Sequence, residues 1–109
     1  RIVRAVPIAE HILAACVDLV RRSRPDDPAA PAWLPRLVRW GCGPRASQAL
    51  AMAAKAAAAM EGRPAAELGD VRRLAAGVLR HRLVLSFEAE AEGITADHVV
   101  ERLLETGNV

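Results

Sequence analysis

The sequence predicts an all-α fold, a small four-helix bundle with room for a short two-stranded β element. Apolar residues recur at helical spacing in four segments, and residues that start or stop helices bound each segment. The chain has 109 residues, 52% of them hydrophobic and 26% charged, which suits one globular domain with a single core. We therefore interpret residues 1–109 as one domain.

The first predicted helix spans residues 7–22 and carries a broad apolar stripe, which implies burial on more than one side. Pro7 opens this helix, because proline is tolerated at the first helical position. Arg21, Arg22 and Arg24 lie at its C-terminal end, where cations suit the helix dipole. We expect these three arginines to form a cluster exposed to solvent.

The segments between the helices predict loops and one β pairing. Four prolines between residues 24 and 35 predict an irregular loop. Residues 37–40 and residues 83–87 are short and β-prone, and their pairing would form the two-stranded element. Residues 88–93 contain three glutamates and are expected to be an acidic connector.

The run Gly41-Cys42-Gly43-Pro44-Arg45-Ala46 leads into the longest predicted helix, residues 44–61. Gly43 suits the N-cap and Pro44 the first helical position. Arg45 then lies in the first turn, where the helix dipole disfavours a cation. Exposed N–H groups together with a guanidinium suit an anion such as a phosphate. The alternative is that Arg45 points into solvent or pairs with a local carboxylate.

Two further helices follow the alanine-rich one. Helix 70–82 has the cleanest amphipathic pattern in the chain, and either Gly69 or Asp70 starts it. Helix 95–106 has Thr95 as its N-cap.

The cysteines and histidines give no sign of metal or triad chemistry. Cys16 and Cys42 lack the spacing of metal ligands, and a helical cysteine is usually a small buried hydrophobe. His11, His81 and His98 are scattered, so we expect no metal site. No apolar run approaches the about 20 residues that a membrane span needs, so no membrane partner is expected.

A sequence pI of about 9.0 leaves one alternative function open, a basic helical module that binds nucleic acid or another protein. Its arginines would be those at the helix ends and outer faces: Arg21, Arg22, Arg72, Arg73, Arg80 and Arg82. Only Trp33, Trp40 and Phe87 are aromatic, which counts against a surface that stacks nucleic-acid bases. Nucleic acid is therefore not the partner we expect.

The run from Gly41 to Ala46 resembles the Gly-Ala-Ser-Pro-Arg-Ala motif of MoxR-type AAA+ ATPases. Further matches follow in the same order over residues 7 to 106: an alanine-rich helix, Gly62-Arg63, Asp70-Val71 and Val78-Leu79-Arg80-His81-Arg82. In that family this region is the C-terminal helical lid. Cys42-Gly43 replaces the usual Ala-Ser, so the hydroxyl of the N-cap is lost; glycine costs only a few tenths of a kcal/mol there, and we expect the turn to persist.

The resemblance implies an AAA+ lid whose ATPase core, with its phosphate-binding loop, is absent from this chain. Arg45 would be the second sensor, reaching the γ-phosphate of ATP, and Pro44 and Ala46 would lie beside the nucleotide. The core would hold Mg²⁺, so this fragment alone should be no enzyme and should bind no nucleotide in isolation. The chain begins at Arg1 without an initiator methionine or signal-peptide pattern, and we expect it to be a piece of a longer protein.

The same resemblance implies the partners. They are the AAA+ core domain of the same chain, neighbouring subunits of a homo-oligomeric ring, and a client or von Willebrand factor A-like protein. The parent protein would be a cytoplasmic ATPase with chaperone-like remodelling activity.

Overall fold

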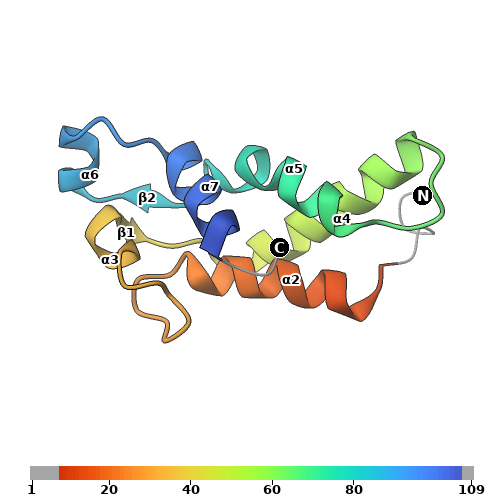
Figure 1. Cartoon of the computed structure of the whole chain (residues 1–109), viewed down its shortest axis with the longest axis horizontal. Helices are drawn as coiled ribbons and strands as arrows, with labels where there is room; N and C mark the ends of the chain where they lie inside the picture. Colours follow the sequence, from red (N-terminus) through yellow and green to blue (C-terminus); the bar gives the residue numbers. More distant parts are fainter. Residues whose placement is uncertain (1–7, 107–109) are drawn as a thin grey trace.

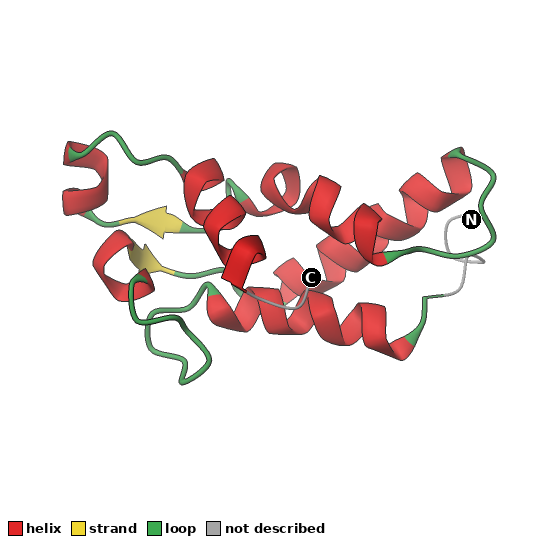
Figure 2. Ribbon diagram, in the orientation of Figure 1, coloured by secondary structure: helices red, strands yellow, loops and turns green. Residues whose placement is uncertain are grey.

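The longest element of the domain is an alanine-rich helix with two other helices packed against it, while the two strands lie toward one end (Figures 1 and 2). The structure is a computed structural model and describes residues 8–106. Along the chain the elements are α2 (Glu10–Arg22), α3 (Leu34–Leu37), β1 (Val38–Trp40), α4 (Arg45–Met60), α5 (Leu68–Leu79), β2 (Val84–Leu85), α6 (Phe87–Ala91) and α7 (Ala96–Thr106). None of the helices in this range is long and apolar enough to cross a membrane.

Helices α2, α4, α5 and α7 form the bundle that the sequence predicts. Helix α4 packs against both α2 and α5, and α7 packs against α5. Leu19, Leu50, Val71 and Leu103 are completely buried where these helices meet. The buried face of α4 is mostly alanine, and such small side chains let neighbouring helices approach closely.

The predicted β pairing is confirmed. Strands β1 and β2 are antiparallel, with Val38 opposite Leu85 and Trp40 opposite Val84, and the register is irregular between these pairs. Figure 1 shows the strand pair at one end of the bundle, with α3 and α6 beside it. This small β end directs the chain from β1 into α4.

Two short helices were not predicted. Helix α3 begins before the expected end of the proline-rich loop, because Pro35 occupies its first turn, where proline costs no hydrogen bond. Helix α6 replaces most of the expected acidic connector. Ser86 is its N-cap and accepts a 3.0 Å hydrogen bond from the N–H of Ala89, which is fully buried.

Each of the four main helices starts at a different residue from the predicted one; α7 starts at Ala96, one residue after the start of its predicted range. Helix α2 starts at Glu10, so residues 8 and 9 are not helical as the range 7–22 proposed; Pro7 lies outside the described residues. Helix α4 starts at Arg45 rather than at Pro44, although Pro44 already has helical angles (φ −59°, ψ −29°). The cap proposed for α7 is confirmed, because the Thr95 hydroxyl accepts a 3.2 Å hydrogen bond from the N–H of His98.

Helix α5 departs most from its predicted range of 70–82. It begins at Leu68, because Glu67 is the N-cap and Asp70, proposed as the starting residue, is the third helical residue. The two carboxylates form a capping box, each accepting from the backbone N–H near the other. The helix ends at Leu79, so Arg82 lies in the turn that follows and not on a helical face.

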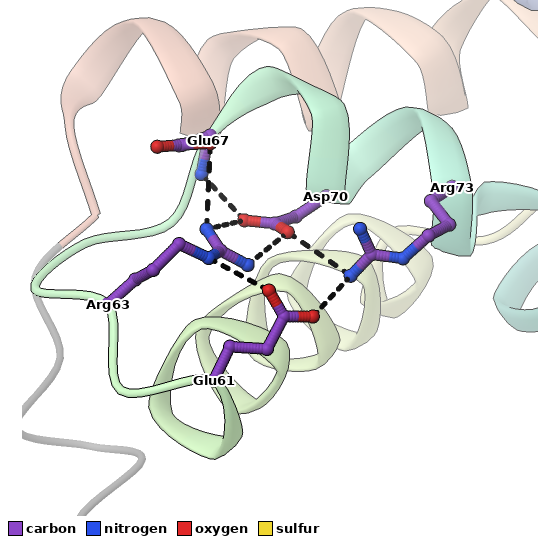
Figure 3. A network of polar contacts seen from close by, with 5 residues as sticks. All are labelled: Glu61, Arg63, Glu67, Asp70 and Arg73. Atoms are coloured by element: carbon purple, nitrogen blue, oxygen red, sulfur yellow. Dashed lines mark hydrogen bonds and ion pairs between the residues drawn. The ribbon is translucent and has the colours of Figure 1, made fainter.

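A glycine and an ion-pair network join α4 to α5 (Figure 3). Gly62 has a φ of +71°, which ends α4, and Arg63 donates its N–H to the carbonyl of Ala58 at 2.8 Å. The Arg63 guanidinium then makes two bonds to Asp70, of 2.6 and 2.8 Å, and one of 3.0 Å to Glu61. Asp70 is only 2% exposed, and the hydrogen bonds from Arg63 hold the pKa of its carboxyl below the ordinary value.

Candidate anion site at the start of α4

The C-terminal end of α2 holds the turn that precedes α4. The hydroxyl of Ser23 donates to the carbonyl of Val20 at 2.6 Å and accepts from the N–H of Cys42 at 3.1 Å. Nε of Arg24 donates to the carbonyl of Cys42 at 2.9 Å. Both backbone polar groups of Cys42 are therefore satisfied by α2 and the residues just after it, and we call this contact the α2 clasp.

Gly41 fits under the clasp because it has no side chain. A Cβ atom at this position would lie 2.5 Å from both the Cα of Arg24 and the carbonyl oxygen of Ser23. Those neighbours are backbone atoms, which cannot move aside as the end of a flexible side chain can. Glycine is thus required for this close approach.

The residues after the clasp begin α4. Gly43, Pro44 and Arg45 are exposed, whereas Ala46 is 1% exposed and belongs to the core. The N–H of Ala46 donates to the carbonyl of Gly43 at 3.0 Å. No side chain caps this helix, and its N-cap is Pro44, so the prediction of Gly43 as the N-cap is wrong by one residue.

The side chain of Arg45 has no hydrogen bond and no ion pair with any residue in the described part of the chain. The alternative of a local carboxylate partner therefore has no support there. Its side chain stands at the positive end of α4, a position that gains from a negatively charged ligand.

The proposed site residues lie together in a depression of about 500 Å³. We call it the arginine depression; its lining residues are Gly43, Pro44, Arg45, Ala46 and Arg82. Two of its lining residues are arginines and none is acidic. Arg82 was missed as a site residue, because the range 70–82 placed it on a helix. The predicted pairing of residues 37–40 with 83–87 was the signal that could have placed it near Arg45.

Most other arginines are engaged within the domain. Carboxylate partners lie within 3.3 Å in the pairs Arg21–Asp27, Arg22–Asp18, Arg36–Glu88, Arg63–Asp70, Arg73–Asp70 and Arg80–Asp97. Arg22 is buried, at 7% exposed, and donates to the carbonyl of Leu103 at 2.7 Å, so the expected solvent-exposed cluster is wrong for this residue. These internal pairs leave little of the arginine set available to a nucleic-acid backbone.

The two cysteines are free and buried. Burial raises the pKa of both thiols; at Cys42 the hydrogen bond with Ser23 and the charges of Arg82 and Arg24 act in the opposite direction. Among residues 8–106, no group of three or more His, Cys, Asp and Glu side chains could hold a metal ion. The structure offers charge, not metal chemistry, at the start of α4.

Comparisons with a family model and with known proteins agree with one another. The family described as the AAA lid domain matches residues 34–103, more than half of the chain. The chain is 41% identical over 69 residues to Chaperone MoxR1 of Mycobacterium tuberculosis, and 49% identical over 51 residues to Protein MoxR of Paracoccus denitrificans. These matches cover 63% and 47% of the chain but only 18% and 15% of the two relatives.

A solved structure shares the fold. The crystal structure of a candidate ATPase from Cytophaga hutchinsonii superposes on 97% of the chain with a TM-score of 0.85 and 29% sequence identity. The matched region is 32% of that protein. The chain thus spans a third or less of the length of each of these similar proteins.

Proposed function

The chain belongs to the AAA lid domain family, as the lid of a MoxR-like AAA ATPase, and from that premise we propose that Arg45 senses the γ-phosphate of ATP. The observation that carries the proposal is an exposed guanidinium at the N-terminal end of α4 that has no partner among residues 8–106. An arginine there is unfavourable for the helix unless an anion offsets its charge. A terminal phosphate is such an anion and suits the planar fork of arginine.

In this proposal the ATPase core of the same protein supplies the rest of the site. The core holds ATP and Mg²⁺, and the lid closes over the nucleotide when Arg45 contacts the γ-phosphate. Hydrolysis and phosphate release remove the partner of Arg45, so the closed arrangement loses that contact and the lid is freer to rotate. Pro44 and Arg45 provide the exposed wall of the site, and Ala46 supports it from the core.

The exposed apolar residues are consistent with a further domain beside the lid. Trp40 is 63% exposed at the end of β1, directly before the turn that leads to Arg45. Val84, which pairs with Trp40, is 50% exposed, so two exposed apolar side chains lie side by side where a neighbouring domain would cover them. We propose that the ATPase core of the same chain covers them, within a homo-oligomeric ring in the cytoplasm.

The work of the whole protein would be chaperone-like remodelling of other proteins. Chaperone MoxR1 carries that description in its name, and this chain resembles it over 69 residues. A client or a von Willebrand factor A-like partner would receive the motion of the lid. These assignments go beyond the domain itself and rest on the resemblance.

Arg45→Ala in the whole protein tests the sensor role. We expect ATP turnover or ATP affinity to fall about ten- to a hundredfold, because a charge-assisted hydrogen bond contributes about 1.5–3 kcal/mol. Steady-state hydrolysis and nucleotide-binding measurements give the two quantities, and circular dichroism checks the fold.

Lys55→Ala is the matched control, since Lys55 is a cation on the same helix, well past the first turn. Its loss should leave ATP hydrolysis unchanged. Unaltered kinetics in Arg45→Ala would remove Arg45 from the mechanism.

A further inference from the structure

Arg82 lines the arginine depression together with Arg45, although the two lie far apart in sequence. The β pairing brings them together. Trp40 lies opposite Val84 in an antiparallel pair, so the residues after β1 run alongside those before β2. The turn at residues 41–43 and the turn at residues 80–83 therefore meet at the start of α4.

Arg82 retains most of its binding capacity. Its backbone N–H donates to the carbonyl of Leu79 at 2.9 Å, and in its side chain Nη1 donates to the carbonyl of Val78 at 3.0 Å. A guanidinium has five N–H donors, and only one of its nitrogens is engaged here. Arg82 forms no ion pair with a carboxylate among residues 8–106, whereas Arg80, two residues earlier, pairs with Asp97 at 3.1 Å.

Arg45 and Arg82 are both cations, and no acidic residue lines the depression to offset their charges. Like charges that share a depression repel each other by an amount that falls with their separation, and an anion between them replaces the repulsion with two attractions. A phosphate group has several acceptor oxygens and can bind both arginines at once.

We propose that Arg82 is a second phosphate-binding arginine, which with Arg45 clamps the terminal phosphate of a nucleoside triphosphate. The proposal rests on the function proposed for Arg45 and adds a residue from the turn that follows α5. The bond from Arg82 to Val78 fixes its guanidinium at the end of α5. The clamp would thus tie α4 and α5 to the same phosphate.

The test is nucleotide binding by the whole protein, with Arg82→Gln, Arg45→Gln and the double variant. We expect Arg82→Gln to weaken binding of the non-hydrolysable ATP analogue AMP-PNP about tenfold, since a charge-assisted hydrogen bond to phosphate is lost. Binding of ADP should change less than about twofold, because ADP lacks the terminal phosphate. In the double variant the two losses should not add, because both arginines contact one group.

Two further variants separate binding from folding. Arg80→Gln removes an arginine two residues away that faces Asp97, and it should leave the affinity for both nucleotides unchanged. Arg82→Lys keeps the charge and should restore part of the AMP-PNP affinity. The melting temperature of each nucleotide-free variant shows whether loss of the bond to Val78 alters the fold.

Each outcome decides. Loss with Arg45→Gln but not with Arg82→Gln overturns the clamp and leaves the sensor role of Arg45 standing. No change in either variant overturns both proposals. Equal weakening of AMP-PNP and ADP, or weakening that follows a lower melting temperature, assigns Arg82 a structural role and overturns the clamp. Weaker binding of inorganic phosphate alone, with AMP-PNP unaffected, makes the ligand free phosphate and also overturns it.

Discussion

The two ends of α4 each carry an arginine in a different state. At the C-terminal end, Arg63 contacts three carboxylates, those of Asp70, Glu61 and Glu67, and lies in a network that joins α4 to α5 (Figure 3). At the N-terminal end, Arg45 is exposed and has no partner among residues 8–106. The same residue type therefore supports the fold at one end and is left available at the other.

The difference shows how the domain separates stability from binding. The buried carboxylate of Asp70 needs the charge of Arg63, because an unpaired charge in the interior is strongly unfavourable. Nothing in the described part of the chain needs the charge of Arg45 in that way. The position of Arg45 is instead fixed through its backbone, by the α2 clasp on the preceding turn.

The largest expected effect comes from disturbing the backbone support of the N-terminal end. Gly41→Ala places a Cβ 2.5 Å from two backbone atoms of α2's C-terminal end, and we expect a loss of about 3 kcal/mol in the free energy of unfolding. Urea unfolding of the 109-residue chain measures it. Gly43→Ala is the control: its Cβ would meet nothing within 4 Å, so stability should change by less than about 1 kcal/mol. Equal stability of the two variants would show that the close contact at Gly41 is relieved without strain.

The next largest effect is expected from breaking the ion-pair network of Arg63 at the C-terminal end of α4. Asp70→Asn should lower the free energy of unfolding by about 2 kcal/mol at pH 7, because Arg63 and Arg73 lose the buried carboxylate that they share, while the amide keeps the shape. Asp97→Asn, at an exposed ion pair with Arg80, should cost less than about 1 kcal/mol and serves as the control.

The pH dependence sharpens this prediction. The folded pKa of Asp70 is lowered by Arg63, so its contribution is complete above the unfolded pKa, about 3.9, and is lost as pH falls through the folded value. The difference between wild type and Asp70→Asn should therefore shrink below about pH 4. A difference that stays constant over this range would mean that the charge of Asp70 contributes nothing.

The smallest effect is expected from substituting Arg45 at the N-terminal end of α4. Arg45→Gln should leave the free energy of unfolding unchanged or raise it by about 0.5 kcal/mol, because it removes a cation from a helix N-terminus. The same urea titration measures it. A loss above about 1 kcal/mol would reveal an internal partner for Arg45 and end the contrast with Arg63.

The sequence predicted the elements whose signals are local and repeated. The long apolar and alanine-rich patterns located α2, α4, α5 and α7, and β-prone residues located the two paired strands. The short α6 was missed because one capping serine and one buried alanine carry its signal among three glutamates. The end of α5 was misplaced because arginines at residues 80 and 82 are as compatible with a helix as with a turn.

The candidate site was predictable in part for the same reason. Arg45 stands in a helix start that a local motif specifies, and the motif resemblance drew attention to it. Arg82 joins it only through the register of the two strands, and Ser23 and Arg24 reach Cys42 only through tertiary packing. Periodicity carries no information on such long-range contacts, so the sequence alone could not supply them.

The α2 clasp links the orientation of α2 to the position of the start of α4. Because Ser23 and Arg24 grip both polar groups of Cys42, a tilt of α2 is passed to the turn and from there to the guanidinium three residues later. A domain that pushed on the exposed side of α2 would therefore shift the tip of Arg45 without touching it. Two hydrogen bonds to Cys42 and the close contact at Gly41 thus link the position of α2 to the position of the Arg45 guanidinium.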